Sequence, residues 1–120
     1  MIQKWSSIIL AVLILTIPLQ TDAFSSQVVE RGAFGDDVIE LQARLQYIGY
    51  YNGAIDGIFG YGTYWALRNF QQDYGLDVDG IAGANTKQAL VNNSQYHRDW
   101  VMEQINKGTR FTHYGGQSLE

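Results

Sequence analysis

A pattern of twelve residues occurs twice in this chain, first from Asp56 and again from Asp79. In each copy an Asp-Gly-Ile triplet is followed, at the same spacing, by a glycine, a threonine and an Ala-Leu pair. Agreement of this kind indicates that one supersecondary unit is used twice. The matching positions are Asp56, Gly57, Ile58, Gly60, Thr63, Ala66 and Leu67 in the first copy and Asp79, Gly80, Ile81, Gly83, Thr86, Ala89 and Leu90 in the second.

Each copy predicts a turn that begins a helix. An aspartate carboxylate can accept nearby backbone N–H groups, and the glycine after it can adopt positive φ because it has no Cβ. The next glycine opens a helix whose first turn contains a threonine able to cap free N–H groups. We expect Ile58 and Ile81 to enter the core. The residues with expected turn and capping roles are Asp56, Gly57, Gly60, Thr63, Asp79, Gly80, Gly83 and Thr86.

Apolar spacing predicts a helix after each turn and one on either side of the repeat. The first helix after a turn extends to Tyr74, and the second is shorter and stops near Asn93. Upstream, apolar residues recur on one helical face, and Glu40 and Arg44 are expected to pair on its solvent side. Downstream, residues 96–107 form a further amphipathic pattern. We therefore predict an all-α protein. Its expected parts are a lead-in at residues 24–34, a three-helix bundle at residues 35–93 and a C-terminal helix at residues 94–108. The tail at residues 109–120 is expected to fray or to begin a linker.

Residues 1–23 have the layout of a secretory signal. One positive charge precedes an apolar stretch, and the small residues Thr21 and Ala23 follow it. The apolar run from Ile8 to Ile17, in which Thr16 is the only polar residue, is shorter than the ~20 residues that span a bilayer, although a retained membrane anchor is the alternative. We predict cleavage after Ala23, secretion, and no membrane association afterwards.

Charge and composition exclude several classes of function. The net charge is −4 and no basic run is present, so nucleic acid is not an expected partner. Cysteine is absent, which removes disulfides and thiolate metal sites. His97 and His113 have no ligand cluster around them, and neither metal nor cofactor is expected.

A set of residues around and before the repeat forms a wider pattern: Gly35, Asp37, Val38, Leu41, Gln42, Leu45, Gly49, Tyr50, Tyr51, Gly53, Asp56, Gly57, Phe59, Gly60, Thr63, Ala66, Phe70 and Gln71. Together they resemble the peptidoglycan-binding module of bacterial cell-wall hydrolases. That resemblance implies a compact three-helix domain that binds peptidoglycan and is usually fused to a catalytic partner. The stretch from Gly60 to Gln71, and the later segment from Tyr96 to Gly115, are more narrowly similar to the N-terminal half of spore cortex-lytic enzymes. In that family a catalytic domain follows, so the resemblance implies a non-catalytic part of such an enzyme.

Peptidoglycan offers sugar rings with apolar faces, amide groups and stem-peptide carboxylates, which aromatic and polar side chains in a groove can bind. The turns between Gly49 and Gly62 bring several aromatic residues together, of which we expect Phe59 and Tyr50 to be core. Arg68, Asn69 and Gln72 lie on the polar side of the second helix, where a solvated face is the alternative reading. The candidate peptidoglycan-binding residues are Tyr51, Tyr61, Tyr64, Trp65, Arg68 and Asn69.

Catalysis is not expected of this chain. Glycan cleavage commonly uses two carboxylates about 5 to 9.5 Å apart, but Asp56 and Asp79 are explained by their turns. The leading hypothesis is binding of spore cortex peptidoglycan, which targets a cortex-lytic enzyme to its substrate. Two alternatives remain open: the chain is part of, or itself, a cell-wall hydrolase or lytic transglycosylase, or it docks a partner cortex-lytic protein through residues 94–108.

Overall fold

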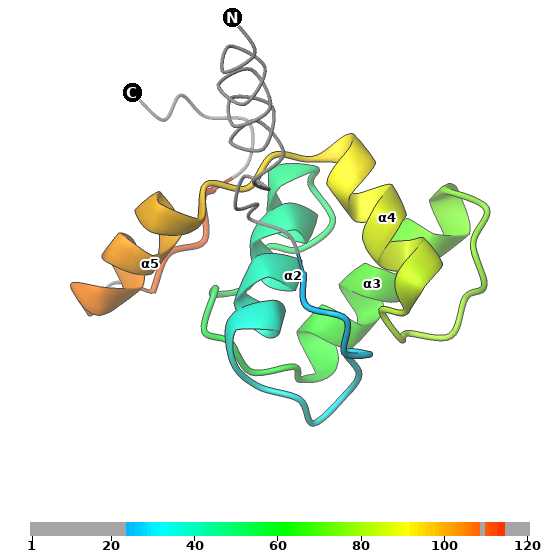
Figure 1. Cartoon of the computed structure of the whole chain (residues 1–120), viewed down its shortest axis with the longest axis horizontal. Helices are drawn as coiled ribbons and strands as arrows, with labels where there is room; N and C mark the ends of the chain where they lie inside the picture. The colour runs from blue at the N-terminus through cyan, green and yellow to red at the C-terminus, as the bar shows by residue number, and fades with distance from the viewer. Residues whose placement is uncertain (1–23, 109, 115–120) are drawn as a thin grey trace, which may run out of the picture.

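The computed structural model describes residues 24–108 and 110–114, and this part of the chain is helical (Figure 1). Two isolated antiparallel bridges are its only β-type pairings. None of the described helices is long and apolar enough to cross a membrane. The all-α prediction is confirmed, whereas the predicted signal at residues 1–23 lies outside the described residues. The helices are α2 (Asp36–Tyr47), α3 (Tyr61–Asp73), α4 (Ala84–Asn93) and α5 (Arg98–Asn106).

Helix α2 packs against both α3 and α4, which together form the three-helix bundle. The predicted apolar faces meet in its core, and the lead-in adds one strongly buried residue, Val29. Burial of these side chains supplies most of the stability that a small domain can obtain. The core residues are Val29, Val38, Leu41, Leu45, Phe59, Ala66, Leu67, Phe70, Ala82 and Leu90.

The residues that enter the core after the two turns differ from the prediction by one position. Ile58 is 59% exposed, whereas the next residue, Phe59, is only 2% exposed. Ile58 pairs with Phe34 in an antiparallel bridge, and successive side chains of an extended segment point to opposite sides. In the second copy Ala82 is the buried residue, and Ile81 is only partly buried. The expectation that the two isoleucines fill the core is therefore wrong.

A buried glutamine on the preceding helix holds each turn. In the first, the side-chain oxygen of Gln42 accepts the N–H groups of Asp56 and Gly57 at 3.0 and 2.9 Å. Its amide nitrogen donates to the Asp56 carboxylate, to the Ile58 carbonyl and to the Thr63 hydroxyl, each at 3.0 Å. The Asp56 carboxylate also accepts the N–H of Ile58, so its predicted turn role is confirmed.

The second turn repeats this arrangement around Gln71. Its oxygen accepts the N–H groups of Asp79 and Gly80, and its nitrogen reaches the Asp79 carboxylate and the Thr86 hydroxyl at 2.9 and 3.2 Å. Gly57 and Gly80 have φ of 77° and 72°, as the turns require.

Gly60 and Gly83 are the N-cap residues of α3 and α4, as predicted, but neither helix has a side-chain cap. The capping role expected of Thr63 and Thr86 is wrong, because their hydroxyls bind the buried glutamines. The threonines therefore connect each helix start to the preceding helix.

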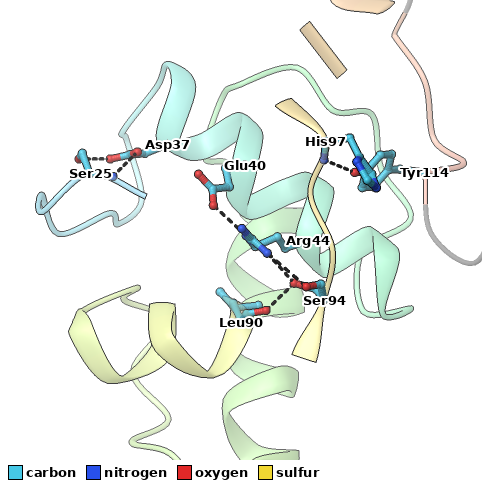
Figure 2. A network of polar contacts seen from close by, with 8 residues as sticks. All are labelled: Ser25, Asp37, Glu40, Arg44, Leu90, Ser94, His97 and Tyr114. Atoms are coloured by element: carbon cyan, nitrogen blue, oxygen red, sulfur yellow. Dashed lines mark hydrogen bonds and ion pairs between the residues drawn. The ribbon is translucent and has the colours of Figure 1, made fainter. Parts of the chain in front are cut away.

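The C-terminal segment covers a second face of α2. Val101 of α5 and Tyr114 are fully buried there against Ile39, Ala43 and Ile55. The Tyr114 hydroxyl accepts the N–H of His97 at 2.7 Å (Figure 2). The expectation that the chain frays after Gly108 is therefore wrong for residues 110–114, because aromatic packing holds this segment.

Glu40 and Arg44 form a buried ion pair at the meeting point of α2 and the segment after α4. Arg44 Nε lies 2.8 Å from Glu40 Oε2, and both side chains are almost inaccessible. Arg44 also donates to the Ser94 hydroxyl at 3.1 Å (Figure 2). The predicted exposed pair is thus covered, because the chain between α4 and α5 crosses this side of α2.

The lead-in is tied to the bundle by polar contacts. The Asp37 side chain accepts hydrogen bonds from both the N–H and the hydroxyl of Ser25 (Figure 2). The Lys87 ammonium, on α4, donates to the carbonyls of Ser25 and Gln27. Residues 24–34 are thereby held across the bundle, which places Arg31 beside α3.

Candidate functional site

Three aromatic residues form a cluster on the first turns of α3. Tyr61 is 66% exposed and Trp65 is 50% exposed, because they lie on the face of α3 opposite its buried residues. The Tyr64 ring contacts both, with its centroid 6.2 Å from that of Tyr61 and 5.4 Å from that of Trp65, and the Tyr61 and Trp65 centroids are themselves 6.4 Å apart. These three positions fall together because residues three and four apart share a helical face. We call Tyr61, Tyr64 and Trp65 the aromatic patch.

Two arginines flank the aromatic patch. The Arg31 guanidinium lies 4.8 Å from the Tyr64 centroid and 5.7 Å from the Tyr61 centroid. The Arg68 guanidinium lies 5.5 Å from the Trp65 centroid and 5.7 Å from the Tyr64 centroid, and it donates to the Val78 carbonyl at 3.1 Å. Cation–π contact holds each guanidinium beside the rings while leaving N–H donors for an anion or an amide.

Tyr64 also forms the wall of a cleft beside the second turn. Its ring packs so closely over Gly80 that a side chain at that glycine would overlap it. The cleft has a volume of about 310 Å³ and is lined by Glu30, Arg31, Tyr64, Asp79, Gly80 and Ile81. The repeat therefore has a direct role in the site, since the turn glycine makes room for a candidate binding residue.

The other predicted site residues are placed differently. Tyr51 is half buried, with its hydroxyl donating to the Ala54 carbonyl at 2.6 Å, and burial raises its pKa. Of the four aromatic candidates, Tyr51 and Tyr64 are partly buried, and Tyr61 and Trp65 are exposed. Asn69 is exposed one helical turn after Trp65, and Arg68 is partly buried. Phe59 is core as predicted, whereas Tyr50 is only partly buried.

Arg31 was not a candidate in the sequence analysis. It lies in the lead-in, far along the chain from α3, and reaches the patch because the lead-in pairs with the first turn. The Phe59 N–H donates to the Ala33 carbonyl at 3.0 Å, and the Gly32 N–H donates to the Phe59 carbonyl at 3.1 Å. No local spacing in the sequence indicates this contact.

The acidic residues of the two turns are occupied by structural contacts. Asp56 and Asp79 each accept the N–H of the isoleucine two residues later and the amide of a buried glutamine. Asp73 accepts the Tyr50 hydroxyl at 2.7 Å. Within residues 24–108 and 110–114, no group of three or more acidic or histidine residues is arranged to hold a metal ion.

Comparison with known families identifies the class of protein that this fold and site define. Residues 34–90, which contain α2, α3, both turns and most of α4, match the family described as "Putative peptidoglycan binding domain". The chain belongs to this family of peptidoglycan-binding domains.

Within that class, the chain is similar to spore cortex-lytic enzymes. It is 68% identical to the spore cortex-lytic enzyme of Bacillus subtilis over 94 residues, which are 78% of this chain and 31% of that protein. It is 65% identical to the enzyme of Oceanobacillus iheyensis over 97 residues, which are 81% of this chain and 35% of that protein. The chain thus spans about a third of the length of these relatives.

A solved structure locates the similarity within such an enzyme. The SleB N-terminal domain matches with a TM-score of 0.60 and 66% sequence identity, over 61% of this chain and 100% of that domain. The chain is homologous to the N-terminal part of spore cortex-lytic enzymes, and the match covers the binding domain. The resemblance stated from the sequence is confirmed.

Proposed function

We propose that this chain binds the peptidoglycan of the bacterial spore cortex, outside the cytoplasm, and holds a cortex-lytic enzyme on its substrate during germination. The family match and the names of the relatives support the ligand and the enzyme. One structural observation carries the proposal: Tyr61 and Trp65 expose their rings next to Tyr64, Arg31 and an adjoining cleft.

The chemistry of this surface suits a cell-wall polymer. Exposed aromatic rings can stack on the apolar faces of acetylamino sugars. Arg31, at the edge of the cleft, can pair with a stem-peptide carboxylate, and Asn69 can exchange hydrogen bonds with amide groups. Affinity then comes from a few fixed contacts, because the net charge of −4 provides no general attraction to an anionic wall.

The test is sedimentation of the full chain with purified cortex or vegetative sacculi. We expect the wild-type chain to sediment, and Tyr61→Ala and Trp65→Ala to lose at least about tenfold in affinity. Tyr74→Ala is the matched control, because Tyr74 is also exposed (40%) but lies at the opposite end of α3. Absence of sedimentation by the folded wild-type chain would reject the proposal.

In this proposal the chain supplies binding and another domain supplies cleavage. We expect no loss of turbidity and no release of muropeptides when sacculi are incubated with this chain alone. We also propose that residues 1–23 direct secretion. N-terminal sequencing of the exported protein should then begin at Phe24, and a mature protein that begins at Met1 would contradict it.

Docking of a partner cortex-lytic protein through residues 94–108 stays a prediction. Val101 of α5 is buried within the chain, and Trp100, Met102 and Ile105 pack against the same cluster. A partner would therefore have to use the remaining, mainly polar side of α5.

A further inference from the structure

Two exposed apolar side chains lie on the segments that lead to the aromatic patch. Phe34 is 82% exposed and Ile58 is 59% exposed. They face each other in an antiparallel bridge, so their side chains project to the same side with Cβ atoms about 5 Å apart. The residues next to them, Ala33 and Phe59, pack toward the core instead. Phe34 and Ile58 therefore form one outward-facing apolar platform.

This platform is connected to the aromatic patch along both segments that build it. Ile58 precedes Tyr61 by three residues, which span at most about 10 Å. Arg31 precedes Phe34 by three residues, and its guanidinium contacts the Tyr61 ring at 5.7 Å. One extended ligand can therefore reach the platform and Tyr61 together.

The backbone between the two surfaces presents no side chain that would obstruct such a ligand, because Ala33 and Phe59 pack toward the core and the other intervening residues are glycines. Gly32 lies between Arg31 and Phe34, and Gly60 lies between Ile58 and Tyr61. A methyl group at either glycine would meet no atom within 4 Å, so both positions border open space. Gly60 has φ of −105°, which any residue can adopt. Neither packing nor backbone conformation therefore requires a glycine at position 60.

We propose that Phe34 and Ile58 form a second sugar-stacking site, and that the ligand of the whole surface is a glycan strand that crosses Gly60. One sugar ring would pack on Phe34 and Ile58, and rings further along the strand would pack on Tyr61 and Trp65. The inference rests on the proposed function and narrows its ligand to the glycan. A glycan fits best because its ring faces repeat along the strand, whereas Asp36 and Asp37, which line the same hollow as Phe34, would repel a stem-peptide carboxylate.

The test uses oligomers of N-acetylglucosamine, which lack stem peptides, and measures binding to the full chain by calorimetry. We expect affinity to rise with oligomer length up to the length that reaches both surfaces. Phe34→Ser should weaken binding of a hexamer by about tenfold and leave binding of a disaccharide unchanged. Phe34 is too exposed for this change to unfold the chain.

A second pair of variants tests the path across the glycine. Gly60→Leu should reduce hexamer binding, because the new side chain stands between the platform and Tyr61. Gly83→Leu is the matched control: Gly83 is the N-cap of α4, has φ of −88°, and also borders open space. We expect Gly83→Leu to bind the hexamer as the wild type does.

The outcomes separate this inference from the proposed function. If the wild type sediments with sacculi but Phe34→Ser binds the hexamer unchanged, the second stacking site is wrong and the proposed function stands. If the chain binds sacculi but none of the N-acetylglucosamine oligomers, the glycan assignment is overturned. The same follows if a free stem peptide competes with the oligomer for the surface. If the wild-type chain forms a dimer and Phe34→Ser does not, Phe34 serves self-association, and the glycan assignment is overturned as well. Failure of the wild type to bind sacculi rejects the proposed function itself.

Discussion

Gln42 and Gln71 hold the two Asp-Gly turns of this chain with the same set of hydrogen bonds. Each accepts two consecutive turn N–H groups and donates to the turn aspartate and to the threonine of the following helix. The internal repeat is therefore larger than the pattern of twelve residues, because each copy includes a glutamine on the preceding helix. The glutamine connects three successive parts of the chain: a helix, a turn and the start of the next helix.

Removing either glutamine side chain should destabilise the fold strongly. Gln71→Ala leaves the buried Gly80 N–H and the Thr86 hydroxyl without their partner, and buried unsatisfied groups cost about 1–3 kcal/mol each. We expect the free energy of unfolding to fall by about 2–4 kcal/mol in urea titrations. Gln72→Ala is the matched control, since the neighbouring Gln72 is exposed and should change stability by less than about 0.5 kcal/mol. Equal effects of the two substitutions would contradict the role of Gln71.

Gly80→Ala should damage both stability and the candidate site. Gly80 has φ of 72°, and a side chain there would overlap the Tyr64 ring, whereas Gly75 has φ of 69° and open space around it. Gly75→Ala should cost about 1 kcal/mol from backbone strain alone, and Gly80→Ala should cost more and displace Tyr64. Thermal unfolding measures the difference, and sacculus binding reports on Tyr64. Adding Tyr64→Ala should recover part of the stability lost in Gly80→Ala, and no recovery would argue against the overlap.

The buried Glu40–Arg44 pair predicts a non-additive mutational cycle. Arg44→Met removes the guanidinium that pairs with the buried Glu40 carboxylate and should cost about 3–5 kcal/mol. Replacing both residues by methionine should be less harmful than Arg44→Met alone, because no uncompensated charge remains. Lys107→Met breaks the exposed pair with Glu103 and should cost less than about 0.5 kcal/mol. A double variant as unstable as the sum of the two single variants would show that the pair does not couple.

Tyr50 should make stability fall at high pH. The pKa of Tyr50 is raised from 10.0 to about 12, mainly by its hydrogen bond to Asp73 and to a smaller extent by burial. Since the folded pKa exceeds the unfolded one, the contribution is complete below pH 10.0 and is lost as pH rises through about 12. Tyr50→Phe should reduce this loss by less than about 1 kcal/mol, because the hydrogen bond is exposed to solvent. Tyr61→Phe is the control, because Tyr61 is exposed at the start of α3, at the opposite end of the helix from Asp73. Urea midpoints measured from about pH 9 to 12 should change in Tyr50→Phe and not in Tyr61→Phe.

Most of the helical fold could be predicted from local patterns. Apolar periodicity indicated all four described helices, and the Asp-Gly pairs indicated where the chain turns. Burial of the isoleucines and capping by the threonines were wrong, because an antiparallel bridge set the side-chain alternation and a distant glutamine bound the hydroxyls. Both outcomes depend on partners that a local pattern does not contain.

The candidate site was only partly predictable for the same reason. Tyr61, Tyr64 and Trp65 share one helical face, so their proximity follows from spacing within α3. The half-burial of Tyr51 and the positions of Arg31 and Phe34 depend on how the lead-in and the first turn pack against the bundle.

By itself, the sequence determined the elements that short-range chemistry controls: the helices, the Asp-Gly turns and the class of domain. Only the tertiary structure decided which side chains face solvent beside Tyr61, because exposure is set by contacts between segments far apart in the chain. It also decided that Glu40 and Arg44 are buried and that Tyr114 closes the second face of α2, since the covering segment follows α4 and returns to the first helix of the bundle.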